Sequence, residues 1–201
     1  IHRDIKPENI FLLNSEEPRV VKIGDFGLAL QSADPNFDGL AACGTTAFMS
    51  PECFTQVKFD AASDVWSLGV CLFELVTGEP DHCAGLTGLP SIPLRRDSQG
   101  DAEALALCQV AADDPAGWDK HLATLREKFT AALTEMYNRE YYRLKGLAEE
   151  ADPDATVSPA QMAGCDRALA VLPQLLCDML AYSKETRPTA AAIERRLAEI
   201  E

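Results

Sequence analysis

The sequence of 201 residues lacks several patterns that would assign it to common functional classes. It contains no G-x-G-x-x-G loop, the glycine-rich turn that many nucleotide-binding sites use. No apolar run approaches about 18 residues, so we expect no membrane span. Basic residues are scarce, with 18 Lys and Arg against 32 Asp and Glu and a net charge of −14. This balance disfavours nucleic acid and anionic membranes as partners.

Cysteine spacing argues against two further classes. The seven cysteines are odd in number and form no C-x-x-C pair, which disfavours a disulfide framework and a zinc site. His82 beside Cys83 lacks a second ligand pair at the usual zinc spacing. Reduced, buried thiols are the simpler interpretation, and they predict a cytoplasmic location. With 47% hydrophobic and 25% charged residues, the chain can form one globular domain.

Three regions follow one another along the chain. Residues 1–78 are dense with short motifs, residues 79–160 combine a Gly- and Pro-rich loop with helical sequence, and residues 161–201 are helical in pattern. The β-branched and aromatic runs Asn9–Leu13 and Val20–Ile23 flank a polar turn, which predicts a β-hairpin. A later run that is apolar on nearly all sides, Ala62–Thr77, predicts a helix buried at the centre of the domain.

Four further helices are predicted from apolar spacing and from the position of proline. Residues Ala102–Ala112 form a short helix, and an amphipathic stripe from Trp118 to Leu147 predicts a long helix that breaks near Gly146. Ser158-Pro159 begins a segment that we expect Pro173 to divide in two. The last helix covers Thr189–Ile200.

The first ten residues contain groups that suit phosphoryl transfer. The carboxylate of Asp4 can accept a hydroxyl proton, Lys6 can neutralise phosphate charge, and Asn9 offers an oxygen to Mg²⁺. A capped turn is the alternative interpretation, because Asp and Asn both favour turns. If the first interpretation holds, the reaction moves a phosphoryl group from a metal-bound nucleotide to a hydroxyl.

Companion motifs downstream favour the catalytic interpretation. In order, the motifs are His2-Arg3-Asp4 with Asn9, Asp25-Phe26-Gly27, Pro51-Glu52, Asp64-Val65-Trp66-Ser67-Leu68-Gly69 and Arg187-Pro188-Thr189. The set resembles the C-terminal lobe of a eukaryotic-type serine/threonine protein kinase, closely over residues 1–78 and loosely over 172–200. This resemblance implies a kinase-like fold of that lobe only, mainly α-helical with a small β-hairpin at the catalytic and metal-binding loops.

The resemblance implies a role for each matching residue of the site. Asp4 is similar to the catalytic base, Lys6 to the lysine on the transferred γ-phosphate, and Asn9 and Asp25 to the ligands of the Mg²⁺ ions that accompany ATP. Thr45, after Gly44, resembles the segment that docks a protein substrate. Together with Lys6 it is typical of kinases that act on Ser or Thr. A surface turn hydroxyl is the alternative for Thr45.

The other matching residues have structural or regulatory roles in the resemblance. They are His2, Arg3, Phe26, Gly27, Glu52, Asp64 and Arg187. Glu52 and Arg187 would form a buried ion pair, and Asp64 would accept hydrogen bonds from the backbone near His2 and Arg3. Trp66 would lie in the core.

Departures from the kinase pattern shape two further expectations. The glycine-rich loop, strand lysine and helix glutamate of the nucleotide site are not found here, so we expect the N-terminal lobe to be absent and residues 1–201 alone to show little activity. Arg187 lies 109 positions after Gly78, which implies an insertion of about fifty residues within 85–160. The alternative function is a truncated, kinase-like binding or scaffold module that acts through the inserted helices.

Two local features leave alternatives open. The apolar stripe of the long helix either packs against the lobe's own helices or forms a docking surface for a partner. Ala41 stands four positions before Thr45, where many such kinases carry a phosphorylatable residue. Asp38 or Ser32 could substitute for that residue, or activation could need no phosphate.

Overall fold

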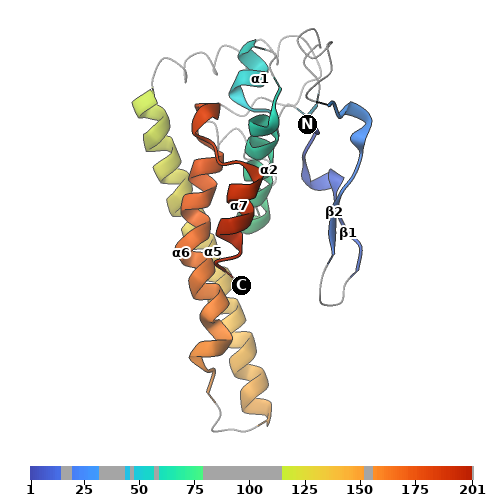
Figure 1. Cartoon of the computed structure of the whole chain (residues 1–201). Helices are drawn as coiled ribbons and strands as arrows, with labels where there is room; N and C mark the ends of the chain where they lie inside the picture. Colours follow the sequence, from blue (N-terminus) through green and yellow to red (C-terminus); the bar gives the residue numbers. More distant parts are fainter. Residues whose placement is uncertain are drawn as a thin grey trace.

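Helices and one small sheet build the structure, a computed structural model (Figure 1). It describes residues 1–14, 20–31, 44–45, 48–56, 59–78, 115–151 and 156–200. The predictions made for Ala102–Ala112, Ser32, Asp38 and Ala41 lie outside these residues. Within the described ranges, no helix is both long and apolar enough to cross a bilayer.

The predicted hairpin is present and stands beside the helices (Figure 1). Strands β1 (Ile10–Leu12) and β2 (Val21–Ile23) pair antiparallel, with Ile10 opposite Ile23. Short 3-10 turns η1 (Pro7–Asn9) and η2 (Phe26–Leu28) adjoin the outer ends of the two strands. The large apolar side chains that the hairpin region exposes are Phe11, Leu12, Leu13, Val20, Val21, Ile23 and Phe26. A hairpin that lies fully in water would not normally expose so many large apolar side chains.

Helix α2 (Ala61–Thr77) forms the centre of the core, as its sequence predicts. Asp60 caps its N-terminus by accepting hydrogen bonds from the backbone of Ala62 and Ser63, and the Ser63 hydroxyl accepts one from Asp60 in return. This reciprocal arrangement is a capping box. At the other end Gly78 adopts a left-handed conformation with φ 69°, which glycine tolerates without strain.

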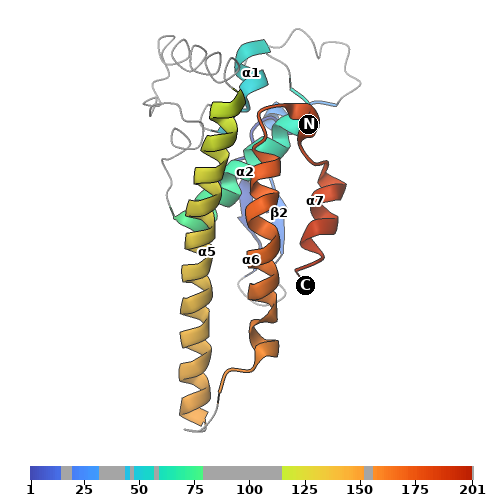
Figure 2. The same cartoon turned by 90° about the vertical axis from the view of Figure 1, so that its left-hand side faces the viewer.

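Two long helices lie side by side and antiparallel against α2 (Figures 1 and 2). They are α5 (Pro115–Ala151) and α6 (Pro159–Met179). The main buried cluster of the three helices is Trp66, Val70, Cys71, Phe73, Trp118, Leu125, Phe129, Leu133, Leu176 and Leu180. A Cβ on Gly69 would lie 3.1 Å from side-chain atoms of both Met179 and Leu180, so glycine allows α2 and α6 to approach closely.

The predicted break at Gly146 and the predicted division at Pro173 are both wrong. Helix α5 continues through Gly146, where good helix formers on both sides outweigh a cost of about 1 kcal/mol for one glycine. Helix α6 likewise continues through Pro173, although proline inside a helix costs about 3 kcal/mol. Pro173 is buried beside Leu175 and Leu176, which are almost fully inaccessible. Burial of this segment against α2 and α5 therefore overrides the local preference.

The apolar stripe of α5 has two different environments. Its first half packs into the core through Trp118, Leu125 and Phe129, as the first of the two interpretations predicts. Its second half exposes Met136 (47%) and Leu147 (52%). Only the first half of α5 is therefore explained by packing against the lobe's own helices.

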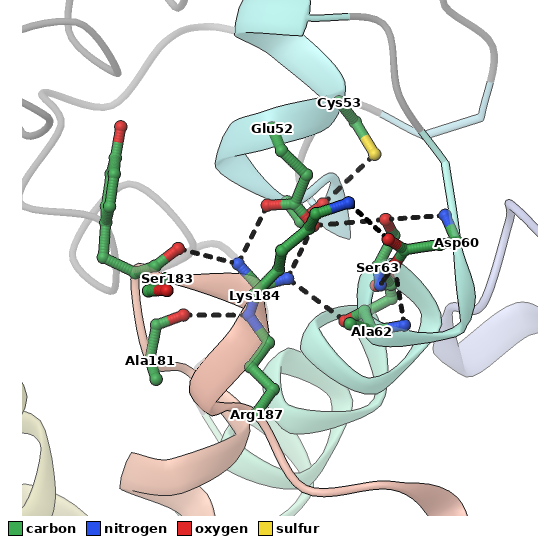
Figure 3. Close-up of polar contacts among 12 residues, drawn as sticks. Glu52, Cys53, Asp60, Ala62, Ser63, Ala181, Ser183, Lys184 and Arg187 are labelled. Atoms are coloured by element: carbon green, nitrogen blue, oxygen red, sulfur yellow. Dashed lines mark hydrogen bonds and ion pairs between the residues drawn. The ribbon is translucent and has the colours of Figure 1, made fainter. Parts of the chain in front are cut away.

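The C-terminal elements return to α2 and meet the short helix α1 (Pro51–Gln56). They are η5 (Lys184–Thr186) and α7 (Ala190–Leu197), which Thr189 caps. The expected ion pair joins them to α1 (Figure 3). Arg187 Nη1 and Nη2 lie 2.6 and 2.9 Å from the two carboxylate oxygens of Glu52. Arg187 also donates to three backbone carbonyls, so the buried charge is well satisfied.

Buried thiols also agree with the sequence. Among the described residues, Cys53 and Cys71 are buried thiols outside any disulfide, and Cys165 and Cys177 are partly buried thiols. Burial raises the pKa of the Cys53 thiol to about 11 and that of Cys71 to about 12. Both thiols therefore stay protonated near neutral pH, and the sulfur of Cys53 accepts a hydrogen bond of 3.1 Å from the Ser50 hydroxyl.

Replacing Glu52 by Gln should destabilise the protein by about 3–5 kcal/mol, because Arg187 would keep its buried charge without a partner. Urea unfolding measures the change. The exposed Glu199→Gln variant is the control and should unfold like the wild type. Equal midpoints for the two variants would show that the ion pair contributes little.

A second ion pair predicts a pH dependence. Lys184 Nζ lies 2.5 Å from Asp60 Oδ2 (Figure 3). Burial raises the pKa of Asp60, but the hydrogen bond and charge of Lys184 and the backbone hydrogen bonds from Ala62 and Ser63 together outweigh it, so the net pKa lies below its ordinary value. The same hydrogen bond raises the pKa of Lys184.

The variant Asp60→Asn should keep the helix cap, since Asn caps as well as Asp, and lose only the ion pair. The contribution of Asp60 is complete above its unfolded pKa of about 3.9 and is lost as pH falls through the lower folded pKa. That of Lys184 is complete below about 10.4 and is lost as pH rises through the higher folded pKa. Urea unfolding across pH should show a stability difference from wild type that is flat between these limits and shrinks outside them. A difference independent of pH would contradict this account.

Candidate active site

The loop that contains Asp4 is held on the first turn of α2. Asp64 Oδ2 accepts a hydrogen bond of 2.7 Å from the backbone N–H of His2, and Asp64 Oδ1 accepts one of 2.9 Å from that of Arg3. These are the hydrogen bonds that the sequence motif predicts. Arg3 has a φ of 68°, a conformation that costs a non-glycine residue about 1–3 kcal/mol. Two charge-assisted hydrogen bonds of about 1.5–3 kcal/mol each can offset that strain.

The buried ring of His2 connects this loop to the segment after β2. Its Nδ1 accepts a hydrogen bond of 3.3 Å from the backbone N–H of Asp4, and its Nε2 lies 2.9 Å from the carbonyl oxygen of Gly24. Because a backbone N–H only donates and a carbonyl only accepts, the ring is neutral with its proton on Nε2. The ring of Phe26 meets that of His2 edge-on, with centroids 5.0 Å apart.

Arg3 points its guanidinium to the other side of the loop. Its Nε donates to the carbonyl oxygen of Leu28, and its Cζ lies 5.6 Å above the ring centroid of Phe59. In the described part of the chain, the buried Nη1 of Arg3 has no hydrogen-bond partner. Arg3 therefore braces η2 and the turn before α2, whereas the Asp4 carboxylate is bound by Thr45, Lys6 and Asn9.

Three of the predicted site residues, Thr45, Lys6 and Asn9, converge on the carboxylate of Asp4. Oδ1 accepts hydrogen bonds from the backbone N–H (2.9 Å) and the hydroxyl (2.7 Å) of Thr45. Oδ2 lies 2.9 Å from Lys6 Nζ and 3.2 Å from Asn9 Nδ2. Lys6 also donates to the Thr45 hydroxyl at 2.9 Å. The contacts rule out a free surface hydroxyl at Thr45.

This environment keeps Asp4 ionised. Burial raises the pKa of the Asp4 carboxyl, but the hydrogen bonds from Lys6 and Thr45 and the charge of Lys6 outweigh it, so the net pKa lies below its ordinary value. The Asp4 side chain is 10% exposed and that of Lys6 23%. An ionised carboxylate of this kind is a strong hydrogen-bond acceptor that a hydroxyl group can reach.

Gly44 is a functional position whose role the sequence motif alone does not reveal. Its φ is 106°, and a Cβ at this position would lie 2.4 Å from the carbonyl oxygen of Arg3. Only glycine therefore lets the chain pass close enough to Arg3 for Thr45 to reach Asp4. The signal in the sequence was the Gly-Thr pair, but the close approach depends on the tertiary structure.

Two candidate oxygen ligands lie at the open end of the hairpin. The pairing of Ile10 with Ile23 places Asn9 next to the segment after β2, and Gly24 N–H donates to the Asn9 carbonyl at 2.9 Å. Within the described residues, the Asn9 side chain forms its hydrogen bonds through Nδ2, which leaves Oδ1 available. Asp25, with φ 57°, uses one carboxylate oxygen to accept from Gly27 N–H. An amide oxygen beside a carboxylate fits Mg²⁺, which otherwise keeps water and phosphate oxygens.

Glu52 and Arg187 are not part of this cluster. They pair with each other, and within the described residues their further hydrogen-bond partners are the Ser63 hydroxyl and backbone carbonyls (Figure 3). Their place supports a structural role.

Segments of several kinases resemble this chain. It is 46% identical over 80 residues to Serine/threonine-protein kinase ATG1a of Arabidopsis thaliana, covering 40% of this chain and 13% of that protein. It is 41% identical over 101 residues to Ribosomal protein S6 kinase alpha-6 of Mus musculus, covering 50% and 13%. CBL-interacting protein kinase 15 of Oryza sativa subsp. japonica is 46% identical over 80 residues, covering 38% and 18%. The match thus spans less than a fifth of each relative's length.

A family model covers far more of the chain than these individual segments. The model of the protein kinase domain matches residues 1–196. The matched range includes the Asp4 cluster, the Asn9 and Asp25 pair, and the ion pair of Glu52 with Arg187. The chain belongs to the protein kinase domain family.

Proposed function

We propose that this chain provides the catalytic loop, the metal ligands and the substrate-docking segment for phosphoryl transfer from ATP to Ser or Thr hydroxyls of proteins. The observation that carries the proposal is the carboxylate of Asp4, kept ionised by Lys6 and Thr45. The free Oδ1 of Asn9 and the carboxylate of Asp25 lie at the adjacent end of the hairpin. A general base beside metal ligands suits this reaction.

In the proposed reaction, the hydroxyl of the protein substrate donates its hydrogen bond to Asp4. Its oxygen forms a bond to the γ-phosphorus while the bond to the β–γ bridging oxygen breaks, and ADP leaves. The hydroxyl proton passes to the Asp4 carboxylate. Lys6 balances the negative charge that develops on the transferred group.

Asn9 and Asp25 would hold Mg²⁺ through Oδ1 and a carboxylate oxygen. When bound, the ion neutralises phosphate charge and orients the phosphates. Asn9 also donates to the Asp4 carbonyl at 2.8 Å, so the same side chain ties the metal ligands to the general base. This coupling supports one shared site.

We further propose that residues 1–201 alone transfer phosphate slowly, because a second lobe must cover the nucleotide. The exposed apolar side chains of the hairpin region, among them Phe11, Leu13 and Phe26, support this requirement. Buried thiols at Cys53 and Cys71 are compatible with a cytoplasmic protein.

Asp4→Asn should lower kcat about 10²–10⁴-fold in the full-length protein that carries these residues, because the amide cannot accept the proton. A radioactive γ-phosphate assay on a Ser- and Thr-containing protein measures the rate. Glu194→Gln changes an exposed carboxylate in α7 in the same way and should leave kcat unchanged. Full activity of Asp4→Asn would overturn the proposed mechanism.

A scaffold module is the second candidate, and the exposed second half of α5 favours it. Met136, Tyr142 and Leu147 are 47, 69 and 52% exposed there. A full-length wild-type protein that transfers no phosphate, but binds proteins through this half of α5, would support the scaffold over the kinase.

A further inference from the structure

Two tryptophans connect the long helix α5 to the ion pair of Glu52 and Arg187. Trp118 of α5 stacks on Trp66 of α2, with ring centroids 5.7 Å apart and an interplanar angle of 26°. The guanidinium carbon of Arg187 lies 4.9 Å from the centroid of the Trp66 ring, in cation–π geometry. Trp66, Trp118, Arg187 and Glu52 are each less than 10% exposed. The ring stack and the cation–π contact are therefore shielded from water, which strengthens both.

Trp118 is the anchored member of the tryptophan pair. Its Nε1 donates to the carbonyl oxygen of Leu180 at 3.2 Å, and its ring meets that of Tyr182 at 5.7 Å. The buried Nε1 of Trp66, by contrast, has no hydrogen-bond partner among the residues described. The position of the Trp66 ring therefore depends on its packing contacts, and the stacked ring of Trp118 is one of them.

Trp118 reaches Arg187 by a second path as well. The carbonyl oxygen of Tyr182, whose ring contacts Trp118, accepts a hydrogen bond of 3.0 Å from Arg187 Nη2. Moving Trp118 would thus disturb two contacts that orient the Arg187 guanidinium. These are the face of the Trp66 ring and the carbonyl oxygen of Tyr182.

The ion pair in turn fixes the segment that leads to the active site. Glu52 lies in the first turn of α1, and the residues just before that helix are also tied down. Ser67 of α2 donates to the carbonyl of Phe48 at 2.7 Å, and Phe48 N–H donates to the carbonyl of Thr45 at 3.0 Å. Thr45 is the residue that binds the Asp4 carboxylate.

We propose that Trp118 is a positioning residue for the substrate-docking segment, holding Arg187 in register with Glu52 through Trp66 and so fixing α1 and Thr45. Helix α5 lies in the region for which the kinase motifs make no prediction, so the motifs do not imply this role of Trp118. The kinetic part of the inference rests on the proposed function, and the structural part does not.

Phe129 is a matched control in the same helix. It is 0% exposed and stacks on Phe73 of α2, with centroids 6.3 Å apart at 23°. Within the described residues, its ring stacks on neither Trp66 nor the Arg187 guanidinium. Phe129→Leu therefore removes an α2–α5 stack of the same kind without touching the path to Glu52.

Amide hydrogen exchange across residues 51–56 tests the path directly. Trp118→Leu should speed this exchange roughly two- to tenfold more than Phe129→Leu does, at conditions of equal global stability. Trp118→Phe keeps an aromatic ring and loses only the bond to Leu180, so it should restore slow exchange. Equal exchange in the Leu variants at positions 118 and 129 would overturn the inference.

The coupling is reciprocal, so a change at the ion pair should also alter the tryptophan stack. This gives a second test that leaves both tryptophans in place. Trp66 and Trp118 are the two tryptophans of the chain, so its near-ultraviolet exciton circular dichroism reports their geometry. Glu52→Asp, which shifts the ion pair but keeps both charges, should change that signal. An unchanged signal in a folded Glu52→Asp protein would also overturn the inference.

Kinetics separate this inference from the proposed function. In the full-length protein, Trp118→Leu should raise KM for the protein substrate roughly two- to tenfold and leave KM for ATP unchanged, relative to Phe129→Leu. Coupling in the exchange data without any phosphoryl transfer would overturn the proposed function alone. Normal transfer with no coupling and no change in KM would overturn the role of Trp118 alone.

Discussion

The carboxylate of Asp64, hydrogen-bonded to the backbone N–H groups of His2 and Arg3, is the contact on which the candidate active site depends. Helix α2 is buried at the centre of the core, so its first turn is a fixed platform. The two hydrogen bonds hold Arg3 in a strained left-handed conformation. That conformation directs the following Asp4 toward Thr45. Asp64 thus joins the first turn of the central helix to the loop that carries Asp4.

A second constraint acts from the other end of the chain. Arg187, which follows η5, crosses to α1 and neutralises Glu52, while stacking over Trp66. Breaking such a buried pair is costly because the remaining charge has no water. The pair therefore fixes the segment that ends in α1, and Trp118 extends the same network into α5. The loop that carries Asp4 and the segment that carries Thr45 are both anchored to α2, which explains how they meet.

The sequence predicts those long-range contacts that the kinase resemblance implies. Asp64 and Glu52 are motif residues of this kind, and both of their contacts are present. The predictions at Gly146 and Pro173 rested on one residue each: neighbouring helix formers outweigh the glycine in α5, and tertiary packing overrides the proline in α6. The stack of Trp118 on Trp66 joins distant positions on different helices, and no local period encodes such a pairing.

The most direct test is the hydrogen exchange of the His2 and Arg3 amides in Asp64→Asn. An asparagine offers one acceptor oxygen, and its amide group would face the other N–H. Losing about 1.5–3 kcal/mol of hydrogen bonding predicts exchange roughly 10–100-fold faster at these two amides, with slow exchange retained in α5 and α6. Unchanged exchange at His2 and Arg3 would contradict the claim that Asp64 positions the catalytic loop.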